Sequence, residues 1–228
     1  ANTVLQSDGT DASWATVALD KLSDVKNGGT NFTNSLKIGN TTHGTLSSAA
    51  RNIGIGDVSL NALTSGVDNI CIGYKSGNAI VDSDANVYIG TEAGLHTVTH
   101  NFGYNVGIGN FAMRGVAGAA DDNTKGQFNT AIGAGALNVG TSARTGEISN
   151  NVAIGTSCME NANLTTAGGN VCIGAAAGNT LRTGGLNTLV GYNTEPSGTA
   201  GNRQIVIGES AVGQGDNTAT IGHTTITD

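Results

Sequence analysis

Histidines and acidic pairs are the first residues to consider for chemistry in this 228-residue sequence, and they are few. His96 and His100 stand four residues apart, a spacing that could hold a metal ion on a helix, but the surrounding pattern predicts a loop between strands. Acidic pairs that could supply oxygens to Ca²⁺ are Asp82 with Asp84 and Asp121 with Asp122. A solvated acidic turn is the commoner explanation of such pairs. We therefore expect no metal and no cofactor.

Other catalytic patterns are absent or incomplete. The three cysteines, Cys71, Cys158 and Cys172, form no Cys-x-x-Cys pair, so we interpret them as small buried residues. The glycine-rich run over 133–137 lacks the Lys-Ser/Thr of a phosphate-binding loop. Carboxylates are sparse, and only a pair joined from neighbouring chains could cleave a glycosidic bond. We expect no enzymatic activity.

The composition favours a thin repeat structure. There are 36 Gly and one Pro, with 12% charged and 4% aromatic residues. Val, Ile and Thr recur at a fixed phase, which separates this chain from disordered glycine-rich sequences. The net charge of −7 excludes a basic footprint for nucleic acid, and no Lys/Arg run could dock an anionic membrane. We therefore expect neither nucleic-acid binding nor membrane insertion.

An Asn-x-x-Ile-Gly pentad repeats along the chain. The leading asparagines are Asn52, Asn69, Asn86, Asn105, Asn129, Asn151, Asn170 and Asn187. The closing glycines are Gly56, Gly73, Gly90, Gly109, Gly133, Gly155, Gly174 and Gly191. Looser copies cover 35–39, 204–208 and 218–222, and successive copies lie 14 to 24 residues apart. Such a period predicts a stack of short β units, each of which can bury its apolar face only against its neighbours.

Alternation within the pentad assigns its residues to two faces. The second and fourth residues, for example Val152 and Ile154, share one face, and we expect that face to be the solenoid core. The middle residue, here Ala153, points the other way and is small or apolar in most copies. We expect identical chains to cover this second face about a shared axis. Lys37, Tyr88 and Thr220 depart from that pattern.

The remaining residues of each unit predict its connections. A small residue stands three positions after each glycine, followed in most copies by an apolar residue or Gly, so each unit is expected to hold a second short strand. The leading Asn can hydrogen-bond its neighbours in the stack, and the closing Gly suits a strand end with positive φ. The predicted fold is all-β: a parallel β-roll or β-solenoid of about eleven repeats and about 50 Å length.

These pentads resemble the head repeats of YadA-type trimeric adhesins, and copies such as 129–133 and 151–155 match that motif closely. The same repeat occurs in phage tail fibres. Residues 3–38 resemble the connector segment of marine, cyanophage-like tail-fibre proteins, which favours the phage fibre. The resemblance implies a left-handed roll over 35–228, preceded by an N-terminal connector over 1–34. It also implies a parallel homotrimer that serves attachment, although the units here are longer than those of adhesin heads.

Function is expected in the long insertions, because loops on a rigid scaffold commonly carry binding residues. The insertions cover 95–104, 110–128 and 134–150. Candidate receptor-binding residues are His100, Phe102, Tyr104, Arg114, Asp121, Asp122, Lys125 and Phe128. A host surface glycan or protein would be the ligand. An equal alternative is that the loops only shield strand edges or pack on neighbouring chains.

Three functions therefore stay open from the sequence. The first is a structural, non-enzymatic segment of a virion tail fibre, associated with other fibre or virion proteins, that presents loops for host attachment. The second is a bacterial cell-surface adhesin head that binds matrix or neighbouring cells. The third is a purely structural fibre spacer.

Overall fold

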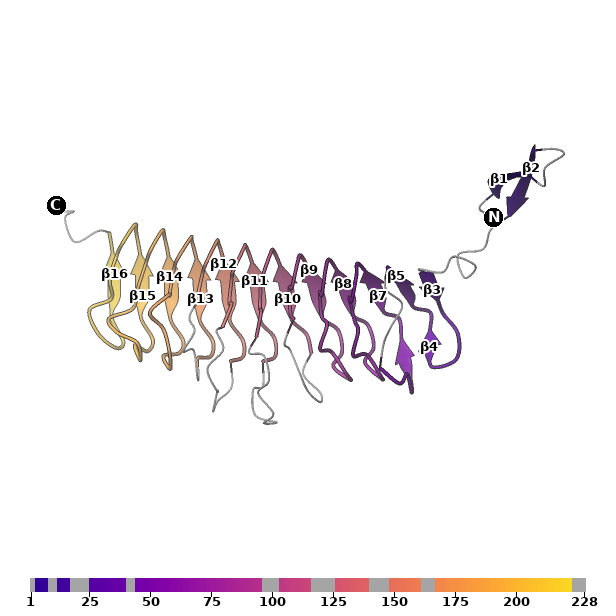
Figure 1. The fold of residues 1–228 in the computed structure, drawn as a ribbon. Coiled ribbons are helices and arrows are strands. Elements are labelled where there is room, and N and C mark those ends of the chain that lie inside the picture. Colours follow the sequence, from indigo (N-terminus) through magenta and orange to yellow (C-terminus); the bar gives the residue numbers. More distant parts are fainter. Residues whose placement is uncertain are drawn as a thin grey trace.

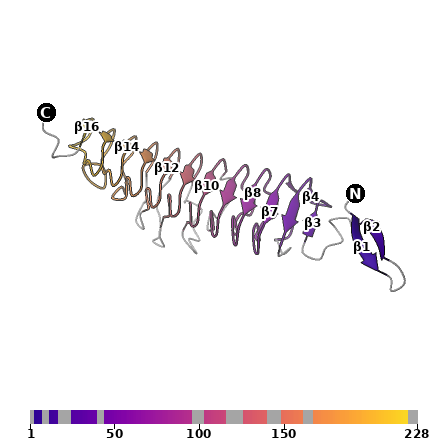
Figure 2. The same cartoon turned by 90° about the horizontal axis from the view of Figure 1, so that it is seen from above.

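The structure, a computed structural model, describes residues 3–7, 12–16, 25–39, 44–95, 103–115, 126–139, 148–160 and 167–222. Its main element is a twelve-stranded sheet whose strands follow one another along a rod (Figure 1). The chain is an all-β parallel β-solenoid built of tandem repeats. Seen from above, the layers follow one another in chain order along one axis (Figure 2).

Every pentad supplies one strand of the sheet. The parallel strands are β5 (Leu36–Ile38), β7 (Ile53–Ile55), β8 (Ile70–Ile72), β9 (Val87–Ile89), β10 (Val106–Ile108), β11 (Thr130–Ile132), β12 (Val152–Ile154), β13 (Val171–Ile173), β14 (Thr188–Val190), β15 (Ile205–Ile207) and β16 (Ala219–Ile221). Equivalent pentad positions pair in register; Val152, for instance, lies opposite Val171. The predicted stack of eleven parallel layers is confirmed.

The expected second strand of each unit is wrong for the described units, because that half forms turns, apart from one isolated parallel bridge between Glu195 and Val212. Val58 and Leu60 have φ of 50° and 49°, and Ser157 and Met159 have 55° and 51°. Two left-handed residues so close together cannot belong to an extended strand. The turns still bond to the next layer, for example from the Leu137 amide to the Cys158 carbonyl at 2.8 Å.

The expected assignment of the two pentad faces is also wrong. The middle residues line the solenoid interior, and Ala131, Ala153 and Leu189 have no exposed surface. The second and fourth residues point outward instead, and Ile132 is 38% exposed. The interior takes the single middle residue of each strand, the small residue of the following turn and, in several layers, the apolar residue after it, such as Leu60, Leu137 and Met159.

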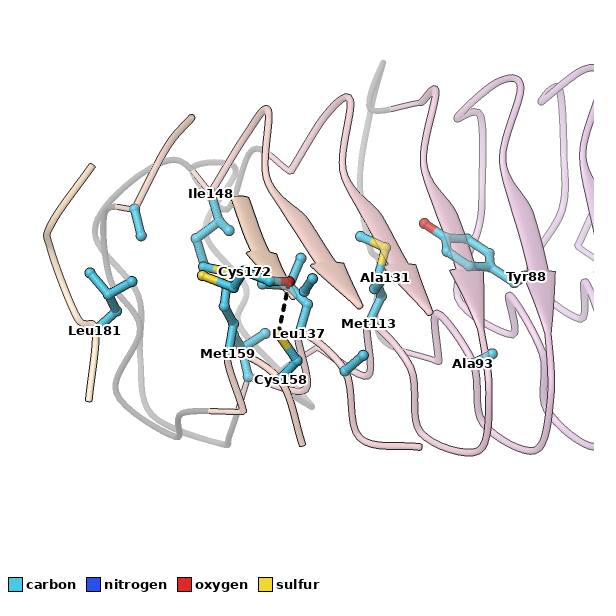
Figure 3. Close-up of a cluster of buried hydrophobic side chains, with 14 of the residues drawn as sticks. Tyr88, Ala93, Met113, Ala131, Leu137, Ile148, Cys158, Met159, Cys172 and Leu181 are labelled. Carbon is cyan, nitrogen blue, oxygen red and sulfur yellow. Dashed lines mark hydrogen bonds between the residues drawn. The ribbon is translucent and has the colours of Figure 1, made fainter. Parts of the chain in front are cut away.

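The interior pairs large side chains with small neighbours (Figure 3). Tyr88 is fully buried, and a Cβ added at Gly107 in the next layer would lie 2.9 Å from its ring atom Cδ1. Lys37 is 1% exposed at the N-terminal end of the same interior. Lys37 and Tyr88, which depart from the pentad pattern, are thus core residues. Glycines at the middle position of the next layer, Gly54 and Gly107, leave room for their side chains.

Amide side chains form a continuous ladder along one corner of the interior. Asn129 is buried; its Nδ2 donates to Asn105 Oδ1 at 3.2 Å and to the Ile148 carbonyl at 2.9 Å. Its Oδ1 accepts from the backbone amide of Asn151 at 3.0 Å. The same bonds recur from Asn52 to Asn187, and the Gln204 amide donates to Asn187 Oδ1. The predicted stacking role of the leading Asn is confirmed.

The closing glycines stack at the other end of each strand. Gly133 has a φ of +135°, and a Cβ there would lie 2.5 Å from the carbonyl oxygen of Gly155 in the next layer. Both the backbone conformation and the close approach therefore require glycine.

Other strands lie at the N-terminal end. β3 (Val25–Asn27) pairs antiparallel with β5 and so covers that edge of the sheet. β4 (Phe32–Thr33) pairs in parallel with β6 (Ala49–Ala50). β1 (Thr3–Ser7) and β2 (Ala12–Thr16) form a separate antiparallel hairpin.

Candidate functional site

One column of mostly exposed residues runs along the corner just before each ladder residue, and we call it the edge column; only Ala85 and Gly169 in it are half-buried. It consists of Arg51, Asp68, Ala85, Tyr104, Phe128, Asn150, Gly169, Leu186, Arg203 and Asn217. All have positive φ, as the chain turns sharply into the strand. Their amides bond to the preceding layer, for example from Tyr104 to the Asp84 carbonyl at 3.1 Å. The column is therefore held in register with the sheet.

Two predicted receptor-binding residues meet on the edge column. Tyr104 and Phe128 end the insertions 95–104 and 110–128, and their rings stack with centroids 5.2 Å apart and planes 14° apart. Tyr104 is 60% and Phe128 53% exposed. A stacked aromatic pair with so much exposed surface can receive an apolar or mixed-polarity ligand.

A charged pair lies on the same column: Asp68 two layers and Arg51 three layers before Tyr104. Arg51 binds Asp68 through two hydrogen bonds of 2.6 and 2.7 Å, and both side chains are about half exposed. Sequence reasoning missed this pair because it searched the insertions. The signal was available, since both residues directly precede a ladder Asn.

Arg114 does not join the aromatic pair. Its guanidinium lies 5.0 Å from the centre of the Phe111 ring, and its Nε is 2.9 Å from Glu92 Oε2. Arg114 thus holds the first turn of its insertion against the preceding layer. The candidates His100, Phe102, Asp121, Asp122 and Lys125 lie outside the described residues.

A second surface follows from the corrected strand orientation, and we call it the aliphatic face. It consists of the second and fourth pentad residues, which form two parallel columns along β5 to β16. Those most exposed are Ile53, Ile132, Ile173, Ile205, Ile207 and Ile221. The described strands place only Val, Ile, Leu, Thr or Ala at these positions, so no charge interrupts the columns.

Burial shifts the pKa of several titratable groups in the interior. Burial lowers the pKa of Lys37 to about 8, although the charge of Asp57 opposes the shift. Burial raises the pKa of the Cys71 thiol, and the neighbouring Cys158 thiol together with burial raises that of Cys172. The Cys158 sulfur lies 3.1 Å from the Cys172 carbonyl oxygen (Figure 3). All three cysteines are free and buried, as predicted.

Within the described ranges, no group of three or more His, Cys, Asp or Glu side chains could hold a metal ion. The same part of the chain contains no helix long and apolar enough to cross a membrane.

Comparison with known proteins adds no relative: no family model, no curated protein and no solved structure matches this chain.

Proposed function

We propose that this chain is a rigid, non-enzymatic segment of a homotrimeric virion tail fibre that presents its edge column and insertions to a host cell. The aliphatic face carries the proposal. It extends along eleven layers of about 4.8 Å, and a three-residue strand spans about 10 Å, so it covers roughly 500 Å². Soluble monomers rarely expose a larger continuous apolar patch.

Further copies of this chain are the occupant that fits this face. Two columns of Ile and Val repeat at the layer spacing of the sheet, and an identical chain offers the same columns over the same length. Parallel copies about one axis would cover all these columns at once, and closed symmetry would leave none exposed. The resemblance of the pentads to YadA-type heads and phage fibres supports three copies.

Such an assembly would leave the edge column free for recognition. Each edge-column residue directly precedes a ladder residue, so the column lies at a corner of the solenoid and not on the aliphatic face. Loops held by a rigid scaffold are common binding elements. A host surface glycan or protein would bind there, and other fibre or virion proteins would join the ends of the rod. The connector-like residues 3–38 favour a virion over a bacterial surface.

The test is binding of the purified 228-residue chain to candidate host cells. One variant replaces residues 116–125 with a short turn, which keeps Arg114 and Phe128. A matched control shortens 140–147 in the same way. Loss of binding in the first variant alone supports attachment through this edge. If wild type binds no cell type, the spacer function replaces the proposal; selective binding to extracellular matrix instead of bacteria favours the adhesin head.

A further inference from the structure

We propose that the edge column between Asp68 and Phe128 binds a single neutral sugar ring of a surface polysaccharide. This inference rests on the attachment function proposed above and names the ligand class of that edge. Five residues define the site: the aromatic pair Tyr104 and Phe128, the small residue Ala85, and Asp68 with its partner Arg51.

The aromatic pair is a fixed platform. Each ring has one face against the other at a centroid separation of 5.2 Å, close to the layer spacing. The outer face of Tyr104 is directed along the column toward the layer of Ala85. Because the pair is already stacked, the Tyr104 ring loses little conformational freedom when a ligand binds, which favours binding.

Ala85 leaves that outer face uncovered by the column. Residues of the column follow one another at one per layer, and the Ala85 amide bonds to Val67 in the layer of Asp68 at 2.9 Å. Tyr104 and Asp68 are therefore two layers, or about 9.6 Å, apart. A ring stacked at about 4.5–5 Å from Tyr104 would occupy the Ala85 layer. About 5 Å would then remain before Asp68, which suits a hydroxyl group and its hydrogen bond.

The polar side of this space suits hydroxyls rather than a charged group. Asp68 offers carboxylate lone pairs beyond those used by Arg51, and Arg51 retains guanidinium donors. The charges of Arg51 and Asp68 compensate each other. The Asp84 carboxylate, which accepts from the Val67 amide at 2.7 Å and interacts electrostatically with Arg51, disfavours an anionic ligand and adds an acceptor for hydroxyls. A sugar ring has an apolar C–H face for Tyr104 and hydroxyls at its rim for Asp68 and Arg51. A sugar ring is thus the ligand class that matches both the Tyr104 ring and the Arg51–Asp68 pair.

Binding can be measured by saturation-transfer NMR with cellohexaose, maltohexaose and mannohexaose as probes, each with the full chain. Tyr104→Ala removes the platform. Ala85→Tyr keeps the platform and fills the space, and its backbone suits a tyrosine because Ala85 and Tyr104 have φ of 56° and 64°. Tyr192→Ala is the control, since Tyr192 is equally exposed at 60% but outside the edge column.

We expect at least one probe to bind wild type and the Tyr192→Ala variant, with at least a tenfold weaker affinity in both site variants. Retained binding in either site variant, or no binding of any probe to wild type, overturns the proposal. Cell attachment by the same four proteins separates the two proposals. Attachment that survives Tyr104→Ala rejects the sugar site and leaves the fibre function intact. Sugar binding by wild type without attachment to any cell rejects the fibre function and leaves the sugar site intact.

Discussion

Tyr88 and Gly107 should be energetically coupled, because one fills the space that the other leaves. Tyr88→Ala removes a fully buried ring and is expected to cost about 3–5 kcal/mol of unfolding free energy. Gly107→Ala places a methyl group 2.9 Å from ring atom Cδ1 and 3.2 Å from Cε1, an overpacking that costs about 1–3 kcal/mol. Gly107 has no positive φ, so alanine suits its backbone.

The double variant should be less destabilised than the sum of the two single variants. With the ring gone, the alanine methyl enters the vacated space, and alanine is also favoured over glycine in a strand by about 0.5–1 kcal/mol. We expect a coupling energy of about 1–3 kcal/mol. The assay is urea unfolding followed by circular dichroism at one fixed protein concentration, since assembly makes stability concentration-dependent.

A matched cycle uses Gly54→Ala in place of Gly107→Ala. Gly54 lies on β7, two layers from Tyr88, where a new Cβ would meet Leu60 at 3.2 Å instead of the ring. Its effect should add to that of Tyr88→Ala within about 0.5 kcal/mol. Additive costs for Tyr88 and Gly107, or a neutral Gly107→Ala, would refute the assignment of the middle residues to the interior.

Three further predictions concern the interior. Asn129→Ala should cost about 2–5 kcal/mol of unfolding free energy, because it leaves the Asn151 amide and the Ile148 carbonyl without their side-chain partner. Faster hydrogen exchange at the Asn151 amide, but not at the distant Gln204 amide, would show that the loss is local. Lys37 has a folded pKa of about 8 against 10.5 unfolded, so the unfolded state binds more protons between these values. The stability of wild type relative to Lys37→Met should therefore rise by about 2–3 kcal/mol from pH 8 to pH 10.5, as urea midpoints of both proteins at each pH would show. The comparison is between the two proteins because the buried thiols, whose pKa is raised, lower the stability of both equally over this range. Finally, the buried thiols with raised pKa should not react with a thiol reagent at pH 8 until urea is added, whereas rapid labelling of the native protein would contradict their burial.

The stack and its register were predictable from the sequence because the pentad has one period. Each leading Asn and closing Gly occupies the same place in every layer, so aligning the copies also aligns the strands. The insertions do not disturb this register, since the strands on either side of them pair at equivalent positions, for example Val106 with Thr130 and Thr130 with Val152.

The choice of the inner face was not predictable from alternation alone. Period two separates the residues into two sets but does not say which set is inside. The amide ladder would have decided it: Asn151 and Ala153 have the same parity, and a buried ladder requires its own face to be the inner one. The variable volume of the middle residue, from Gly54 to Tyr88, also indicates local packing.

The candidate site was predicted in part. Tyr104 and Phe128 stand 24 residues apart, and only their shared position before a ladder Asn brings them into adjacent layers. Sequence reasoning selected both for their position in insertions, so it found the residues and missed the column that joins them with Arg51 and Asp68.

The most direct test of the central claim is the mass of the protein in solution. Sedimentation equilibrium of the wild type should give three times 22.7 kDa. The variant Ile132→Lys, which places a charge on the aliphatic face, should sediment as a smaller species and keep its β circular dichroism signal. A wild-type chain that stays monomeric and folded at micromolar concentration would contradict the account, because its aliphatic face would then need no partner.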